Sequence, residues 1–256
     1  SDLYQEPIYS QMDELKSLGF SYGRIDGWFD NKIMFIEGTY DFFKIDLIIK
    51  KLLKMNIKPY IEINVYEFLG KEQIFLKNVG CLFKHFVDTY GNDEVKIWMV
   101  DIVSRKGEGD NRKYVNQLAK DEQVQFFKMF ETLKLLIKEV SQDIKVGGGG
   151  VRIDDLYKPF INDFYIHSKE CSVFPDFLSI SLYQFDRKNG GERENQFEEK
   201  ISPDPSFMRR KTTELKKELS LVGGDIKIVI VDFNMTFSNN DIINDTSFKG
   251  TFLIKN

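Results

Sequence analysis

The stretch EVKIWMVDIV, residues 94–103, is a short apolar run that lies between a segment with helical spacing and a polar loop. Similar runs, rich in apolar and β-branched residues, recur along the chain and alternate with longer amphipathic stretches. This alternation is the signature of β-α units around a parallel sheet. The runs that we expect to be strands are residues 20–27, 58–66, 95–103, 144–150, 176–184 and 226–234.

Between these runs, apolar residues recur three and four positions apart, as they do in helices that pack on a sheet. The expected helices are residues 46–55, 122–140 and 207–219, and polar stretches at residues 105–116, 185–205 and 238–245 are expected to be loops. The sequence therefore predicts an α/β fold, namely a TIM-type (β/α)8 barrel. Since six strands are clear, we expect the barrel to be incomplete and to lack its first and last strands.

The length of 256 residues is normal for one β/α barrel, so residues 1–256 are expected to form a single domain. The chain begins at Ser1 without a methionine, which indicates a domain excised from a larger protein. The net charge is −4, with 36 basic and 40 acidic residues, and provides no broad cationic field for nucleic acid. We therefore expect no direct contact of this chain with DNA.

The cysteines and the hydropathy pattern indicate the compartment. Cys81 and Cys171 have no CxxC spacing, which fits a reduced cytoplasmic protein better than a disulfide scaffold. No apolar run is long enough to predict a membrane span, and no signal pattern begins the chain. A cytoplasmic location without membrane contact is the resulting prediction.

Several segments, in the same order, resemble one protein family over nearly the whole chain. They are FSYGRIDGWFD, YDFFKIDLIIKKLLKMNIKPYIEI, IKVGGGG, DFLSISLY and VIVDFNMTFSNNDIINDTSFKGTFLIKN. The succession resembles glycoside hydrolase family 39, the β-xylosidase-like barrels. It resembles still more the barrel module carried by some bacterial AraC-type transcription regulators.

The resemblance implies a retaining mechanism, which needs two carboxyl groups about 5 Å apart. In the family the acid/base glutamate lies in a WNEP-type motif at the end of the fourth strand. Laid on Trp98, this motif puts Met99 at its asparagine and Val100 at its glutamate, so the proton donor is missing. The nucleophile motif, of TEWN type, matches residues 231–234 and puts Asp232 at the glutamate.

These two departures from the family motifs argue against catalytic hydrolysis of glycosides. Aspartate is one methylene shorter than glutamate, and a displacement of about 1 Å can lower a rate on the order of 100-fold. Loss of a positioned acid lowers it by a further factor of about 10² to 10⁴. We therefore expect a pseudo-glycosidase with no catalytic residue.

The resemblance leaves a vestigial pocket at the carboxyl ends of the strands, where barrels of this type carry their sites. Asp26 replaces a family histidine, and Ser179, Ser181 and Tyr183 stand where the family has an S.H.Y pattern. Trp28, Tyr66, Trp98 and Tyr183 are candidates for stacking on a sugar ring, although most aromatic side chains must belong to the core. The pocket or ligand-binding residues are predicted to be Arg24, Asp26, Glu62, Trp98, Val100, Tyr183, Asp232 and Asn234.

Two further features predict no cofactor and no metal. The run VGGGG, residues 146–150, lacks the lysine and the Ser/Thr of a phosphate loop, so a tight strand-to-helix turn is expected. His85 and His167 are the only histidines and have no partner at metal-ligand spacing, which favours surface or cap roles.

The function that the resemblance implies is a non-catalytic sensor or interaction domain of a cytoplasmic AraC-family transcription regulator. Its pocket is expected to bind a sugar-like effector or to serve homodimerisation, and DNA is contacted through a domain outside this chain. The alternative is an active, β-xylosidase-like retaining glycoside hydrolase that pairs Asp232 with a carboxylate such as Glu62, Glu67 or Asp101. A structural module without a ligand is a third hypothesis.

Overall fold

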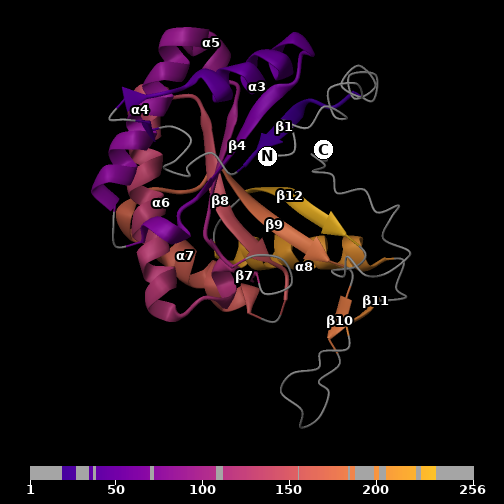
Figure 1. Ribbon diagram of the computed structural model, residues 1–256. Coiled ribbons are helices and arrows are strands. Elements are labelled where there is room, and N and C mark those ends of the chain that lie inside the picture. Colours follow the sequence, from indigo (N-terminus) through magenta and orange to yellow (C-terminus); the bar gives the residue numbers. More distant parts are fainter. Residues whose placement is uncertain are drawn as a thin grey trace.

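A six-stranded parallel sheet forms the centre of the computed structural model, in the order β1-β4-β5-β8-β9-β12 (Figure 1). The structure describes residues 19–26, 35–36, 39–69, 72–107, 112–154, 156–183, 185–187, 199–201, 206–222 and 226–234. The strands are β1 (Tyr22–Ile25), β4 (Lys58–Asn64), β5 (Met99–Val103), β8 (Lys145–Arg152), β9 (Phe177–Tyr183) and β12 (Lys227–Asn234). All the predicted strands are thereby confirmed.

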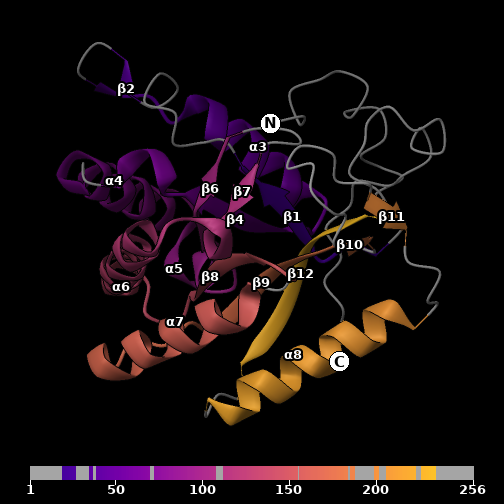
Figure 2. The same cartoon turned by 90° about the horizontal axis from the view of Figure 1, so that it is seen from below.

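Helices follow the strands and lie along the outside of the curled sheet, as Figure 2 shows for α4, α6, α7 and α8. They are α3 (Phe43–Lys54), α4 (Glu72–Tyr90), α5 (Asn92–Val95), α6 (Lys120–Val140), α7 (Tyr157–Cys171) and α8 (Phe207–Leu221). The short 3-10 helices are η2 (Tyr66–Phe68) and η4 (Val115–Gln117). Three two-stranded ladders complete the fold: β2 (Phe35–Ile36) with β3 (Thr39–Tyr40), β6 (Arg105–Lys106) with β7 (Lys113–Tyr114), and β10 (Phe185–Arg187) with β11 (Glu199–Ile201). The prediction of an incomplete α/β barrel is confirmed.

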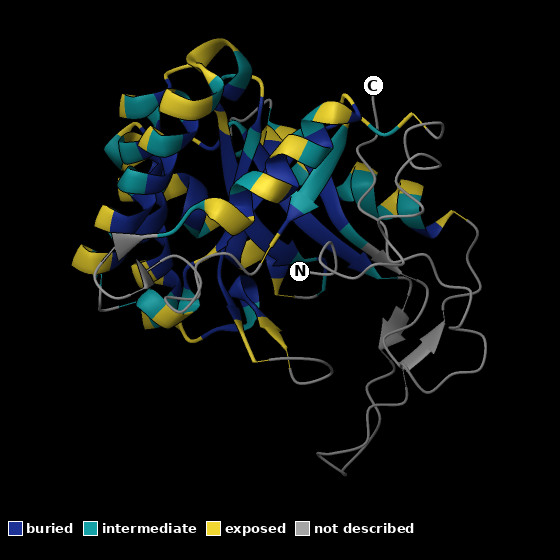
Figure 3. Ribbon diagram, turned by 45° about the horizontal axis from the view of Figure 1, so that its top comes forward, coloured by how far each residue is buried: buried dark blue, intermediate teal, exposed yellow. Residues whose placement is uncertain are grey.

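The main core lies between the helices and the outer face of the sheet, where the strands are buried and the helices expose only their outer sides (Figure 3). Strand geometry sends alternate side chains to opposite faces. In β4, Ile61 and Ile63 enter the main core, whereas Tyr60 belongs to a small inner cluster with Phe177. The inner face of the sheet therefore receives the polar residue Glu62, which lies between the two isoleucines.

A bulge in β12 decides which face Asp232 occupies. Ile230 pairs with Ile180, but Asp232 pairs with Ser181, so one extra residue, Val231, lies between two successive pairs. In a regular strand Asp232, two positions after Ile230, would share the face of Ile230 and point toward the helices, since the side-chain period of a strand is two residues. The bulge thus places the carboxylate on the inner face.

Three expectations differ from the structure. The glycine run is not a strand-to-helix turn: Gly147–Gly150 lie inside β8, whose pairing with β9 shifts between Gly148 and Val151. Helices α4 and α7 were indicated by helical spacing around His85 and His167, but no bounds were predicted for them. The stretches expected as loops at 105–116 and 185–205 contain the β6-β7 and β10-β11 ladders, while 238–245 lies outside the described residues.

Within the described residues, no helix is both long and apolar enough to cross a membrane.

Candidate functional site

Four charged side chains meet on the inner face of the sheet, toward the carboxyl ends of its strands. Arg24 of β1 donates to Glu62 Oε2 of β4 at 2.5 Å and to Asp232 Oδ1 of β12 at 2.8 Å. Arg105, which follows β5, donates from Nη1 to Glu62 Oε1 at 2.7 Å, and its Nη2 lies 3.6 Å from Asp232 Oδ2. We call these four residues the arginine–carboxylate cluster.

The cluster alternates two cations with two anions. Both oxygens of Glu62 accept from a guanidinium, and the side chain is only 5% exposed. Asp232 is the more accessible carboxylate, at 23% exposed. Such a ring balances its own charge, because each buried ion has an opposite partner within ion-pair distance.

Asp232 is held in its ionised form. Burial acts to raise the pKa of this carboxyl, but the guanidiniums of Arg105 and Arg24 and the hydrogen bonds from Arg24 and Ser181 outweigh burial and keep the pKa below its usual range. Ser181 donates to Oδ2 at 3.0 Å. The structure therefore presents an aspartate anion at the end of β12.

The backbone on either side of the cluster is fixed by hydrogen bonds. The Asn64 side chain accepts from the Arg105 amide at 3.0 Å and donates to the Arg105 carbonyl at 3.1 Å. Arg24 also approaches the Val231 carbonyl at 3.4 Å, so its side chain joins the first and the last strand of the described sheet. The positions of both arginines thus depend on neighbouring strands.

A second acid, Asp101, lies beneath the cluster and has no exposed surface. Tyr60 donates its hydroxyl to Oδ2 at 2.9 Å, and Ser179 donates to Oδ1 at 2.6 Å. Burial, together with the nearby charge of Glu62, raises the pKa of Asp101 to about 6. Since it is enclosed, Asp101 is a structural group that a substrate cannot reach.

This pKa predicts a specific dependence of stability on pH. The pKa of Asp101 is above its usual 3.8, so between about pH 4 and pH 6 the folded chain keeps a proton that the unfolded chain has released. The free energy of unfolding should therefore fall as the pH rises through this window, by on the order of 2 kcal/mol, and stay lower above it. Asp232 acts in the opposite sense and at lower pH: its stabilisation is present above about pH 4 and is lost as the pH falls below that value.

Denaturant unfolding of the wild type and of Asp101→Asn at a series of pH values measures this effect. Asparagine cannot lose a proton, so the variant should lack the fall between about pH 4 and pH 6 and keep the change below pH 4. Parallel curves for the two proteins across the window would contradict the prediction.

Aromatic residues border the cluster. The Tyr114 and Tyr183 hydroxyls are hydrogen-bonded at 2.7 Å, and the Arg105 guanidinium lies 5.8 Å from the centre of the Tyr114 ring. The Arg152 guanidinium lies 5.7 Å from the centre of the Tyr183 ring. Of the two rings, Tyr114 is only 1% exposed, whereas Tyr183 is partly exposed and is the one that a sugar could reach.

The structure brings together only part of the predicted pocket. Arg24, Glu62, Tyr183 and Asp232 lie at the cluster, and Asp26 is an exposed residue whose charge acts on Arg24.

The other predicted residues lie elsewhere. Trp98 and Val100 lie in the main core, where the Trp98 indole donates to Glu94, so they are not part of the site. The Asn234 backbone pairs with Tyr183, but its side chain and the whole of Trp28 lie outside what the structure describes.

Sequence reasoning missed Arg105, which was assigned to a loop. A usable signal was present, because Arg105 comes two positions after Val103, the last residue of β5. In a parallel barrel the residues just beyond a strand's carboxyl end line the site.

Comparisons with known proteins match nearly the whole chain to one family. Residues 5–256 match the family model described as glycosyl hydrolases family 39. The chain is 23% identical to a β-xylosidase of Caldicellulosiruptor saccharolyticus over 93% of this chain and 51% of that protein. It is 21% identical to a β-xylosidase of Geobacillus stearothermophilus over 95% of this chain and 53% of that protein.

Solved structures share the fold. A monomeric β-xylosidase from Caulobacter crescentus CB15 superposes with a TM-score of 0.70 at 19% identity, over 91% of this chain and 51% of that one. An enzyme of the same family from Xanthomonas axonopodis pv. citri gives 0.71 at 17% identity, over 93% and 49%. The chain therefore spans about half the length of these relatives.

These findings correct one expectation. The prediction of an AraC-type transcription regulator, with its DNA-binding role, is wrong, because the matched family is one of glycosyl hydrolases and the relatives are β-xylosidases. The alternative function, a glycoside hydrolase, fits them better. The predictions of a single domain, of homodimerisation and of a cytoplasmic location stay predictions.

Proposed function

The chain belongs to glycosyl hydrolases family 39, and from this premise we propose that it is a β-xyloside-binding member with a reduced catalytic site. Asp232 supplies the nucleophile, and among the described residues no group at the cluster supplies the proton that a poor leaving group needs. The observation that carries the proposal is that a guanidinium, that of Arg105, faces the ionised Asp232.

Ligand binding is supported by the part of the cluster that solvent reaches. The side chains of Asp232 and Arg24 are 23% and 15% exposed, whereas Arg24 Nε and Arg105 Nε and Nη2 are buried and have no hydrogen-bond partner within the described part of the chain. The exposed parts of the carboxylate and the guanidinium can exchange hydrogen bonds with sugar hydroxyls. The partly exposed Tyr183 lies beside Asp232.

The position of the missing acid follows from the strand boundaries. In the family the proton donor stands at the end of this strand, and β5 ends at Val103, three residues beyond Val100. Ser104 and Arg105 are therefore the residues at the donor's place. A guanidinium does not release a proton near neutral pH, and serine is a very weak acid.

Glu62 and Asp101 cannot replace it. Both oxygens of Glu62 are engaged by arginines, and Asp101 has no exposed surface.

The chemistry that remains is one displacement. An oxygen of Asp232 attacks the anomeric carbon and forms a glycosyl–ester bond. The bond between the anomeric carbon and the leaving oxygen breaks, and the leaving oxygen keeps the electron pair. An acidic phenol leaves as a stable anion without a proton, whereas an alkyl alcohol does not. Water then attacks the ester slowly, because no general base among the described residues of the cluster assists it.

We therefore predict a single burst with an activated substrate. Incubation of the chain with dinitrophenyl β-xyloside should release up to about one equivalent of dinitrophenolate, followed by a much slower phase, as expected for an accumulating covalent intermediate. Intact mass should increase by one pentosyl residue. Methyl β-xyloside should not be hydrolysed.

Variants identify the group that reacts. Asp232→Asn should abolish both the burst and the mass increase, whereas Asp88→Asn, at an exposed ion pair with Lys84, should change neither. If the wild type hydrolyses methyl β-xyloside steadily and Asp232→Asn does not, a proton donor is working. That result would overturn the proposal of a reduced catalytic site. A thermal shift with xylose or xylobiose measures binding separately, because a ligand of the folded state raises the melting temperature.

A further inference from the structure

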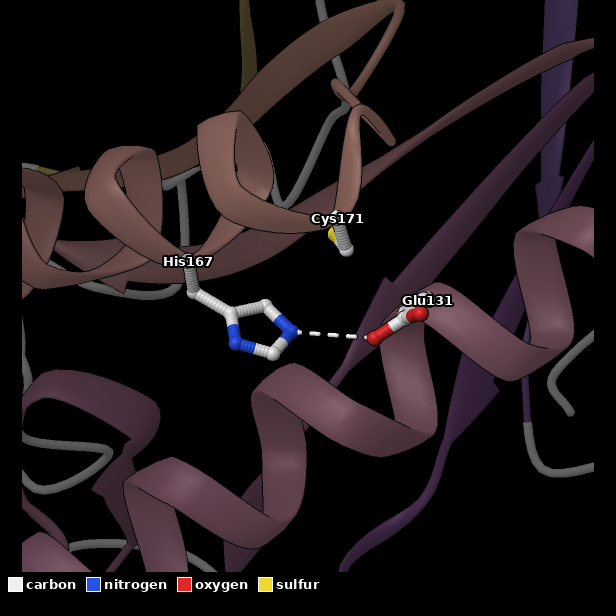
Figure 4. Close-up of side chains that lie close together, drawn as sticks. All are labelled: Glu131, His167 and Cys171. Atoms are coloured by element: carbon white, nitrogen blue, oxygen red, sulfur yellow. Dashed lines mark hydrogen bonds and ion pairs between the residues drawn. The ribbon is translucent and has the colours of Figure 1, made fainter.

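Three side chains with metal-ligating atoms converge between two helices of the outer layer. Their residues lie within the helices and not at the carboxyl ends of the strands. Glu131 extends from α6, and His167 and Cys171 extend from α7 toward it (Figure 4). One ligand atom of each, a carboxylate oxygen, an imidazole nitrogen and the thiol sulfur, lies within 4.8 Å of the other two. The three residues therefore face one point.

Helix geometry explains the convergence. His167 and Cys171 are four positions apart, which puts both on one face of α7, one turn from each other. Glu131 lies on the facing side of α6, and its Oε2 is 3.2 Å from His167 Nε2. The packing of the two helices, with Phe127 and Phe164 stacked at 5.4 Å between ring centres, holds the two faces together.

The spacing matches the coordination edge of a small cation. Zinc binds imidazole nitrogen and carboxylate oxygen at about 2.0–2.2 Å in tetrahedral geometry, so two such ligands are about 3.3 Å apart. The observed 3.2 Å between His167 Nε2 and Glu131 Oε2 agrees with that edge. The Cys171 sulfur donates a long hydrogen bond, 3.7 Å, to the Ser168 carbonyl and lies within 4.8 Å of the ligand atoms of His167 and Glu131.

We propose that Glu131, His167 and Cys171 bind one Zn²⁺ ion that joins α6 to α7. A thiolate and an imidazole with one carboxylate are the ligand mixture that favours zinc over magnesium or calcium. Three protein ligands leave one tetrahedral position for water. The side chains of His167 and Glu131 are 22% and 31% exposed, so an ion reaches the site directly from solvent.

A reactive thiol is a less suitable role for the same residues. Catalytic cysteines have a lowered pKa, whereas burial, with a contribution from the Glu131 charge, raises the pKa of Cys171. The site is also independent of the glycoside site, because no residue of the arginine–carboxylate cluster takes part in it.

The experiment is a titration of the full chain, without an affinity tag, with Co²⁺ as a spectroscopic substitute for Zn²⁺. We expect one ion per chain, with a near-ultraviolet band from thiolate-to-cobalt charge transfer that Zn²⁺ displaces. Cys171→Ser should abolish the band. His167→Gln and Glu131→Gln should weaken binding at least about 10-fold, since even the loss of an outer partner of a ligand costs 10- to 100-fold.

The chain contains its own matched controls. Cys81→Ser and His85→Gln change the other cysteine and the other histidine, which lie on α4 and outside this site, and should leave the titration unchanged. Melting curves without metal show that each variant is folded. Saturating Zn²⁺ should raise the melting temperature of the wild type and not that of Cys171→Ser.

Absence of the charge-transfer band in the wild type, or its persistence in Cys171→Ser, would overturn the proposal, as would its loss in Cys81→Ser. In those cases His167 and Glu131 form only a hydrogen-bonded pair.

Discussion

Replacement of Glu62 by alanine is expected to lower the free energy of unfolding by about 3–5 kcal/mol. Glu62 is the only residue of the arginine–carboxylate cluster that makes short hydrogen bonds to both arginines. Without it, Arg24 and Arg105 would repel each other with only Asp232 to balance them. Their side chains are only 15% and 6% exposed, so water cannot compensate well.

Urea unfolding of Glu62→Ala and Glu62→Gln measures the effect. Glutamine keeps the shape and loses the charge, so it should fall between the wild type and alanine. The matched control is Glu218→Ala, which breaks the half-exposed pair with Lys158 and should change little, as surface ion pairs contribute little. Equal, small changes in Glu62→Ala and Glu218→Ala would show that the cluster does not stabilise the sheet.

The second large effect is expected in the glycine run of β8. A Cβ on Gly148 would lie 2.3 Å from the Ile102 carbonyl oxygen of the neighbouring strand and 3.1 Å from the Phe130 ring. The carbonyl belongs to backbone at the centre of the sheet and cannot move aside. Gly148→Ala should therefore destabilise the protein by about 3 kcal/mol or more, at the upper end of the cost of overpacking.

Gly80 in α4 provides the opposite case for the same substitution. A Cβ there would meet only the end of the Leu136 side chain, at 3.6 Å, which is an ordinary contact. Alanine is favoured over glycine in a helix by about 1 kcal/mol, so Gly80→Ala should stabilise. Thermal and denaturant unfolding of both variants checks the pair, and a Gly148→Ala protein as stable as the wild type would refute the packing argument.

The glycine run shows why a strand-to-helix turn was wrongly expected at residues 146–150, inside a stretch that was also predicted to be a strand. Glycine is depleted in strands, so four in succession indicate a turn when propensity alone is considered. In the fold these glycines are required by their neighbours: a Cβ on Gly147 would lie 2.4 Å from the Phe177 carbonyl oxygen. Close approach between strands is a tertiary property, and it outweighs the local preference.

The strands were predictable because each is a compact apolar run with clear polar flanks. The bounds of helix α4 could also have been predicted, since Phe75, Val79, Leu82 and Phe86 recur at spacings of three and four and are all buried. The fold class thus follows from periodicity, but the complete list of helices requires every amphipathic stretch to be tested.

The site was harder to predict than the fold. Motif alignment identified Arg24, Glu62 and Asp232, which do lie together. It anchored the donor motif on Trp98, at the start of the strand, and so it missed Arg105 beyond the strand's end. The inward direction of Asp232 depends on the bulge at Val231, and the partnership of Glu131 with His167 joins residues 36 positions apart. Neither feature has a signature in sequence spacing.

The link that Arg24 makes between β1 and β12 has a mechanical consequence. Elsewhere in the described sheet, neighbouring strands are joined by ladders of main-chain hydrogen bonds, whereas β1 and β12 are joined by the Arg24 guanidinium, which is also part of the arginine–carboxylate cluster. This side-chain contact can break without the loss of any main-chain hydrogen bond between strands. A ligand that draws Arg24 away from Asp232 would remove this contact and leave the 3.6 Å ion pair of Arg105 with Asp232 in place. Binding at the cluster would then change how firmly β1 is held to β12.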